Sequence, residues 1–402
     1  MPALDLSPYR RALTNRPLRT ALVLGALVRG PVFAGGVLLT VHVVTSLGRS
    51  YAEAGLVSAA ATVAVAVSGP WRGRLLDRLG LRRVVLPSIA VAAVCWSIAP
   101  FVGYVPLLVL AVVAGLFVIP SFSIIRQAVI AAVPEGDRRS AISLDAAAIE
   151  LSFMAMPALA VWAATVWDTS WVLLVTQLSG VLGGVALYVV NPPMRQAGET
   201  RPGGGPVPWR SWFRLPFLAV CLAAAASTLV LSGTDIGVVA VMREAGTPAQ
   251  IGVVLALWGL GSLVGGLVYG ALHRPISAFW LLAGLAVVTA PMALAHTTLT
   301  LSAVAFVAGL LCAPTITATI DQATRVVPAA VRGEAMGWHG SFMTAGSAVG
   351  APVAGIAIDE AGAGAGFVAV AVVGLGVALL GVGAAGAVRR ARADRAAQAS
   401  PV

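Results

Sequence analysis

Residues 84–125 read VVLPSIAVAAVCWSIAPFVGYVPLLVLAVVAGLFVIPSFSII, and no charged residue occurs between Arg83 and Arg126. About 20 apolar residues cross a bilayer as an α-helix, so this stretch predicts two crossings that turn at Gly103–Pro106. A second stretch, from Arg274 to Asp321, contains no charged residue apart from titratable His296 and predicts two more crossings. Irregular backbone and open sheet edges do not occur in contact with lipid, so the spans are predicted to be helices.

The composition extends this interpretation to the whole chain. Of 402 residues, 59% are hydrophobic and 10% are charged, and the mean hydropathy is +0.93. A soluble domain carries about 25% charged residues. We therefore predict an all-α integral membrane protein with twelve transmembrane helices, at residues 18–47, 52–72, 84–102, 105–132, 138–166, 169–190, 215–242, 248–272, 276–295, 298–326, 331–358 and 364–388.

The basic residues predict the orientation of these spans. The sequence has no lysine, so all 26 basic residues are arginine. Placing both termini in the cytoplasm leaves only Arg49 and Arg243 outside, with Arg29 and Arg126 inside spans, as the positive-inside rule requires. The net charge of +10 therefore sets topology and does not indicate a nucleic-acid partner. The first apolar run is too long for a cleaved signal and predicts an uncleaved helix in the inner (cytoplasmic) membrane.

An internal repeat divides the spans into two sets of six. Gly115 and Pro120 match Gly309 and Pro314 at an offset of 194 residues, and Val133-Pro134, Arg138 and Ala141 find partners at the same offset. Parallel repeats of this size are typical of transporters. The predicted organisation is a cytoplasmic N-terminus at 1–17, a six-helix bundle at 18–190, a cytoplasmic linker at 191–214, a pseudo-symmetric six-helix bundle at 215–388 and a cytoplasmic tail at 389–402.

The loop after the second span carries a recognisable motif. It contains Gly73, Asp77, Arg78, Gly80, Arg82 and Arg83 in the pattern G-x-x-x-D-R-x-G-x-R-R. Glycine permits a tight turn and close packing, and the arginines keep the loop on the cytoplasmic side. In position and spacing this resembles the signature of the major facilitator superfamily, and the resemblance extends over about residues 15–388. Among its members, the chain resembles bacterial efflux permeases of the twelve-helix type.

The resemblance implies a gate at Asp77. In the family this acid meets the N-terminal end of the eleventh helix when the cytoplasmic side is closed, where a helix dipole and unpaired amides favour a carboxylate. The corresponding loop after the eighth span keeps Arg274 but has His273 in place of the acid. Ala111 replaces an arginine common in the family's fourth helix, and Met156 precedes Pro157 where drug antiporters have glycine, which weakens a multidrug assignment.

Four ionisable residues within spans are candidates for proton or substrate binding. Counting ~1.5 Å per residue from the helix ends places Arg29 and Glu150 roughly 16–20 Å deep, and Arg126 and Asp145 at about 10–12 Å. Matching depths therefore suggest the pairs Arg29–Glu150 and Arg126–Asp145. A charge at the bilayer centre costs at least ~2.5–3.5 kcal/mol, so these residues either form static ion pairs or serve a proton or substrate.

Further candidates are expected in the second bundle. Asp235 has no obvious basic partner and is either a proton or cation site or a residue of a wet outer vestibule. Trp258, Trp338 and His339 either line the central cavity or pack within the helices.

These features predict a secondary active transporter that works by alternating access. We expect proton-coupled export of a small organic molecule by a monomer, with the substrate, protons and the lipid bilayer as its partners. An importer of a small anionic metabolite bound by Arg29 and Arg126, or a non-transporting sensor or assembly partner, are the alternatives. The chain has no phosphate-binding lysine motif, and its four histidines lack metal-ligand spacing, so we expect no enzyme activity, no cofactor and no metal.

Overall fold

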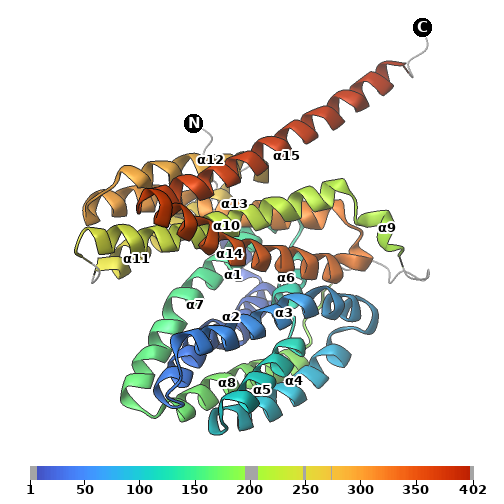
Figure 1. Cartoon of the computed structure of the whole chain (residues 1–402). Helices are drawn as coiled ribbons and strands as arrows, with labels where there is room; N and C mark the ends of the chain where they lie inside the picture. The colour runs from blue at the N-terminus through green and yellow to red at the C-terminus, as the bar shows by residue number, and fades with distance from the viewer. Residues whose placement is uncertain (1–6, 195–206, 248–249, 273, 399–402) are drawn as a thin grey trace. The chain divides into compact units, whose positions relative to one another are not determined.

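The computed structural model describes residues 7–194, 207–247, 250–272 and 274–398, and all the regular elements in these ranges are helices (Figure 1). This confirms the predicted all-α class. The α-helices up to Trp212 are α1 (Ser7–Thr14), α2 (Arg16–Thr45), α3 (Tyr51–Leu79), α4 (Leu81–Ile98), α5 (Tyr104–Leu116), α6 (Ser121–Ala131), α7 (Arg138–Val166), α8 (Thr169–Val190) and α9 (Trp209–Trp212). Those that follow are α10 (Leu215–Glu244), α11 (Ile251–Ala271), α12 (Ala278–Thr289), α13 (Thr298–Val326), α14 (Arg332–Ala361) and α15 (Ala365–Gln398).

Short 3-10 helices extend or join these elements. They are η1 (Ala99–Phe101), η2 (Glu135–Asp137), η4 (Ala290–Leu294) and η5 (Ala329–Val331). Among the described residues, 11 helical segments are long and apolar enough to cross a membrane, and α12 with η4 forms a shorter apolar segment, Ala278–Leu294. The chain is therefore a multi-pass membrane protein.

Local capping explains where the helices near the motif begin and end. Ser50 and Glu53 form a capping box at the start of α3, in which each side chain binds the other residue's backbone N–H. Gly80 separates α3 from α4 with a φ of 80° and a ψ of 171°. A side chain is disfavoured at that positive φ, so the turn requires glycine. At the end of α8, Asn191 adopts a left-handed conformation with a φ of 45°.

The fourth predicted span, residues 105–132, is interrupted. The chain leaves the helix at Phe117 and resumes it at Ser121, after Pro120. Proline lacks an N–H, and its ring clashes with the carbonyl four residues earlier, which favours a break. Pro314, the repeat counterpart, lies inside the continuous helix α13. Neighbouring helices and local adjustments of the backbone allow a transmembrane helix to tolerate proline.

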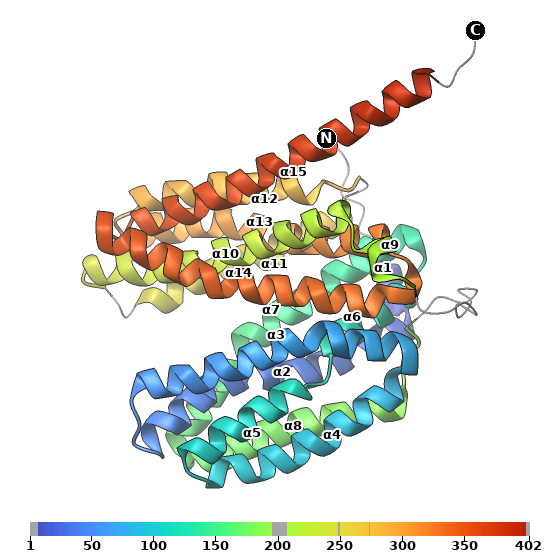
Figure 2. The same ribbon diagram turned by 45° about the vertical axis from the view of Figure 1, so that its right-hand side comes forward.

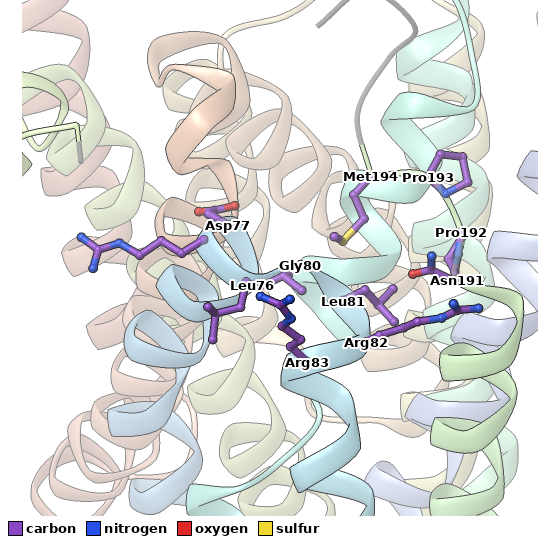
Figure 3. A pocket seen from close by; sticks show the side chains of 12 residues that line it. Leu76, Asp77, Gly80, Leu81, Arg82, Arg83, Asn191, Pro192, Pro193 and Met194 are labelled. Carbon is purple, nitrogen blue, oxygen red and sulfur yellow. The ribbon is translucent and has the colours of Figure 1, made fainter. Parts of the chain in front are cut away.

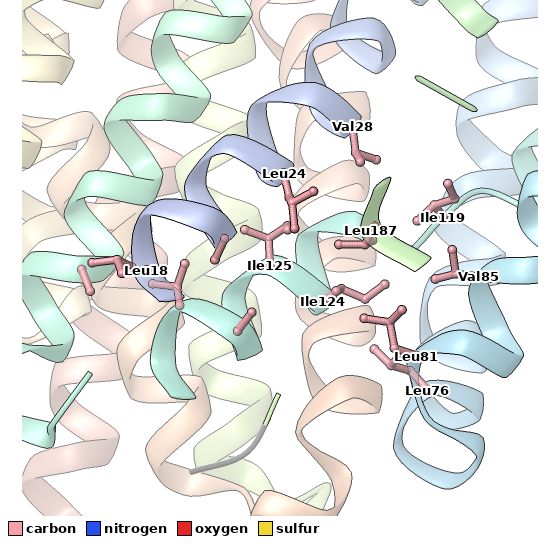
Figure 4. Close-up of a cluster of buried hydrophobic side chains, with 14 of the residues drawn as sticks. Leu18, Leu24, Val28, Leu76, Leu81, Val85, Ile119, Ile124, Ile125 and Leu187 are labelled. Carbon is pink, nitrogen blue, oxygen red and sulfur yellow. The ribbon is translucent and has the colours of Figure 1, made fainter. Parts of the chain in front are cut away.

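The described residues form two compact units. The first contains those of Met1–Trp212, Gly266–His273 and Ala323–Thr344. In this unit, α2 packs against α7 and α8, and α3 lies beside α5 (Figure 2). A buried apolar cluster joins α2, α3, α4, α6 and α8 (Figure 4), with Leu24, Leu76, Val85, Ile125 and Leu187 among its members. This cluster anchors the helices that carry the site described below.

The second unit comprises the described residues of Phe213–Gly265, Arg274–Gln322 and Ala345–Val402. Helices α10, α12 and α15 pack on one another, and a buried cluster around Met242, Met292 and Phe367 joins α10, η4 and α15. Helices α11 and α13 approach closely at glycines: a Cβ atom at Gly265 would overlap the Leu310 carbonyl, and one at Gly309 would overlap the Trp258 carbonyl. Small residues at such crossings allow membrane helices to pack through their backbones.

Replacing Gly265 with alanine is therefore expected to destabilise the protein by about 1–3 kcal/mol, because the added methyl group must push α11 away from α13. The melting temperature of the purified protein in detergent measures the effect. Gly252→Ala is the matched control, since Gly252 lies on the same helix with open space around it. Equal melting temperatures for the two variants would contradict the close packing.

Candidate functional site

Asp77 lies in the last turn of α3, beside the first turn of α14. The N–H of Gly333 donates to Asp77 Oδ1 at 2.9 Å, and the N–H of Glu334 donates to Oδ2 at 2.8 Å. The first N–H groups of a helix have no partner within it and carry the positive end of the dipole, so a carboxylate there stabilises the contact. This is the contact that the motif resemblance implies; the gating role of Asp77 stays a prediction.

An ion pair that sequence reasoning missed reinforces this contact. Arg74 Nε lies 3.0 Å from Glu334 Oε2, and Arg74 Nη2 lies 2.6 Å from Glu334 Oε1. The Glu334 side chain is 7% exposed. Two parallel bonds between a guanidinium and a carboxylate fix orientation as well as distance. Glu334 thus contributes its backbone N–H to Asp77 and its side chain to Arg74.

Glycines bring the two helix backbones together at the same place. Cβ atoms at Gly73 or Gly337 would overlap backbone atoms of Gly333 or Gly69, respectively. One turn further along α14, the Ser341 hydroxyl donates to the Ala66 carbonyl at 2.6 Å. The contact therefore pairs two G-x-x-x-G sequences, Gly69 with Gly73 on α3 and Gly333 with Gly337 on α14. That pattern, which marks close helix packing, was the available signal for finding it.

The remaining motif residues border an open pocket (Figure 3). Its volume is about 670 Å³, and its lining includes Arg78, Gly80, Arg82, Arg83 and the segment Asn191–Met194. Arg82 donates to the carbonyls of Tyr188 and Val189 at 3.2 and 3.4 Å and stacks over the Tyr188 ring. It thereby binds the last turn of α8, where carbonyls lack helical partners. Arg78 and Arg83 are exposed.

Side chains from the N-terminal parts of α1 and α7 donate hydrogen bonds to backbone carbonyls at the end of α11. The Tyr9 hydroxyl donates to the Leu267 carbonyl, the Arg139 guanidinium to the Leu272 carbonyl, and the Ser140 hydroxyl to the Gly270 carbonyl at 2.7 Å. Burial raises the pKa of Tyr9 to about 12, so its hydroxyl keeps the proton that it donates. At the end of α11, donors on α1 and α7 thus bind backbone carbonyls, whereas at the start of α14 the carboxylate of Asp77 binds backbone amides.

A buried ion pair lies between α2 and α7. Arg29 Nη1 is 2.5 Å from Asp145 Oδ1, Nη2 is 3.4 Å from Oδ2, and each side chain is 2% exposed. The Arg29 guanidinium also lies over the Phe122 ring, 4.7 Å from its centroid. Phe33 makes edge contacts with Phe122 and Phe153. The buried charge pair therefore borders Phe122, which belongs to a connected set of three aromatic rings.

The pairing suggested by depth is wrong for both arginines. Arg29 binds Asp145, not Glu150, and Arg126 makes no ion pair with Asp145. Depth measures only the level along a helix, whereas the direction of a side chain turns by about 100° per residue. Asp145 and Glu150, five positions apart, consequently point to different sides of α7.

Arg126, on α6, is buried beside this pair. It lies within electrostatic range of both Asp145 and Arg29, and His339 of α14 lies within electrostatic range of Arg126. Its Nε atom has no hydrogen-bond partner. In the part of the chain that the structure describes, Arg126 makes neither an ion pair nor a hydrogen bond. The local balance is two guanidinium groups to one carboxylate.

The other sequence candidates are distributed between the units. Glu150 is half-buried on α7 in the first unit. Trp338 of α14 is half-buried against Phe342, and His339 is completely buried. In the second unit, Asp235 is exposed on α10, and Trp258 packs beside the cluster around Met292. The structure thus brings Arg29, Asp145, Arg126 and His339 together in one unit.

A multi-pass helical protein with charges buried inside its spans and a carboxylate bound to a helix start is organised as a membrane transporter. The family model described as Major Facilitator Superfamily matches residues 21–238 and 220–400, and the chain belongs to this family. The predicted family is thereby confirmed, and the chain is a transporter rather than an enzyme.

Several solved structures share the fold. A bacterial homologue of the iron transporter ferroportin in an outward-facing state has a TM-score of 0.72 at 15% identity, over 92% of this chain and 100% of that one. The proton:xylose symporter XylE has a TM-score of 0.68 at 12% identity, over 92% and 95%. The human organic anion transporter MFSD10 (TETRAN) has a TM-score of 0.64 at 18% identity, over 92% and 98%. No curated protein matches the chain by sequence.

Proposed function

We propose that this chain is a secondary active transporter that exports a small organic molecule in exchange for protons by alternating access. The observation that carries the proposal is the buried group of Arg29, Asp145 and Arg126 within the spans. Charges at such depth are costly and mark ion or substrate pathways in membrane proteins. The contact of Asp77 with the first turn of α14 is the second feature that supports the proposal, as a cytoplasmic gate that forms and breaks during the transport cycle.

The proposed setting is the inner membrane, with both termini in the cytoplasm and the two six-helix bundles at 18–190 and 215–388 as the moving parts. The excess of arginine in the loops assigned to the cytoplasm supports this orientation. The similarity to a proton:xylose symporter is compatible with proton coupling. The export direction is supported by the resemblance to bacterial efflux permeases and by the absence of a recognisable sugar- or peptide-importer motif in the sequence.

Proton-sensitive dye trapped inside proteoliposomes tests the proposal. A panel of small organic acids, amines and neutral compounds is added outside, one at a time, to vesicles containing the purified protein. In exchange, uptake of a substrate drives protons out, so the lumen becomes alkaline. In symport the lumen becomes acidic, which would replace export with the importer alternative. A panel that moves no protons, and shows no counterflow of labelled compounds, would favour the sensor alternative.

Glu150 is the proposed proton carrier. Arg29 binds Asp145, so protonating Asp145 would break a buried ion pair, whereas protonating Glu150 would leave that pair intact. Glu150 is half-buried on α7, one and a half turns beyond Asp145.

Replacing Glu150 with glutamine is expected to abolish proton-coupled flux while substrate counterflow persists, because the amide mimics the protonated acid. The dye assay and counterflow of a labelled substrate measure the two activities on the same vesicles. Asp359→Asn, at an exposed acid near the end of α14, is the control and keeps both. Intact proton movement in Glu150→Gln would exclude this role and direct attention to Asp235.

A further inference from the structure

We infer that Arg126 is the group that recognises the substrate, and that the substrate is a small organic monoanion with an aromatic or apolar body. This inference rests on the proposed transport function and names the substrate class of the same site. It also gives Arg126 and Arg29 different roles, whereas the sequence analysis offered both as binding residues for an anion.

The charge balance around Arg126 carries the first step. The residue is 7% exposed, and its Nε atom has no partner. The neighbouring carboxylate, Asp145, is occupied by both terminal nitrogens of Arg29. Arg29 itself repels Arg126, and His339 supplies no negative charge. One net positive charge therefore remains in the interior without a counterion among the residues that the structure describes.

The chemistry of the guanidinium indicates the ligand. A guanidinium presents a planar fork of N–H donors that matches a carboxylate or a similar oxyanion. Charged residues inside membrane spans are rare and mark substrate or ion pathways, so a buried charge without a counterion is a candidate to bind a ligand of opposite charge. A single excess positive charge is neutralised by a monoanion, whereas a cation would be repelled and a neutral amide would leave the charge uncompensated.

The surroundings indicate the rest of the molecule. Phe122 lies four positions before Arg126 on α6, one helical turn away, and is 39% exposed. Phe122, Phe33 and Phe153 form a connected set of edge-to-face contacts. Aromatic rings in this arrangement accept another aromatic or apolar group readily. An anionic group at Arg126 with an apolar body against Phe122 satisfies both features.

The test compares ligands that share a body and differ only in charge. Phenylacetate, 3-phenylpropionate and 4-phenylbutyrate, each with its amide and its corresponding amine, are added to the full-length protein in detergent. Binding is followed by the rise in melting temperature and by calorimetry. At least one carboxylate is expected to bind, while its amide and amine bind at least tenfold more weakly, since a charge-assisted pair is worth about one to two decades of affinity.

Variants assign the effect to Arg126. Arg126→Gln is expected to lose anion binding by about 10- to 100-fold, and its ligand-free melting temperature is expected to rise, because an unpaired buried charge is removed. Arg126→Lys keeps the charge without the fork and is expected to bind with intermediate affinity. Arg19→Gln, at an exposed arginine of the first turn of α2 and outside the motif, leaves both quantities unchanged.

Two results would overturn the inference. A lower ligand-free melting temperature in Arg126→Gln would show that Arg126 already has a structural partner, such as a carboxylate of this chain. Transport of a neutral or cationic compound in the dye assay, with no carboxylate binding, would reject the anionic substrate while leaving the proposed transport function intact. Absence of any proton or solute movement would reject the transport function itself.

Discussion

Replacing Asp77 with asparagine is expected to reduce transport by tenfold or more while the protein remains folded. The carboxylate accepts one N–H on each oxygen, from Gly333 and Glu334. Asparagine has one acceptor oxygen, and its NH₂ group would face the second N–H donor. Loss of one charge-assisted bond is worth about 1.5–3 kcal/mol. The ratio of the conformations with and without this contact changes tenfold for each ~1.4 kcal/mol. The conformation that contains the contact would therefore lose population.

Counterflow of the identified substrate in proteoliposomes measures this effect, and the melting temperature in detergent reports folding. Asp359→Asn is the matched control because Asp359 is exposed near the opposite end of α14. Gly333→Ala offers an independent approach to the same contact, since a Cβ atom there would approach Asp77 Oδ1 to 2.6 Å. Near-normal flux in Asp77→Asn would contradict the proposed gating role of Asp77.

The largest expected effect on stability belongs to Asp145. Replacing it with alanine leaves Arg29 buried, with its side chain 2% exposed and without its counterion. Removing one partner of a buried ion pair typically costs about 3–5 kcal/mol, because the remaining charge is neither solvated nor compensated. Arg126 lies within electrostatic range of Arg29, so two like charges would then face each other without Asp145.

Thermal and denaturant-induced unfolding of the purified protein would measure this loss. Arg29→Met combined with Asp145→Ala is expected to recover much of it, because the double change removes both charges and fills the space with an apolar side chain. If Asp145→Ala alone unfolds at the same temperature as the native chain, the buried pair contributes nothing to stability, contrary to the structure.

Much of the candidate site follows from local sequence. The motif that contains Gly73, Asp77 and Gly80 resembles the family signature, and that resemblance implied a carboxylate at a helix start. The same reasoning failed for Arg29, because counting along a helix gives depth and not the direction of the side chain. Arg74 and Glu334, separated by 260 residues, gave no local signal for their ion pair. Tyr9 and Ser140 were equally invisible, since their partners are backbone carbonyls.

The division into bundles at 18–190 and 215–388, with a pseudo-twofold relation, stays a prediction. What the sequence determined by itself is the class of fold and the number of apolar segments, because the cost of burying a charge or an unpaired backbone group in lipid acts on each span separately. Tertiary structure alone decided which charges pair, that the G-x-x-x-G pair of α3 meets the one of α14, and that Arg126 lies beside the complete ion pair of Arg29 and Asp145. These outcomes depend on how helices that are distant in the chain rotate and cross. Packing between the helices determines that geometry, and the hydropathy of the sequence contains no information about it.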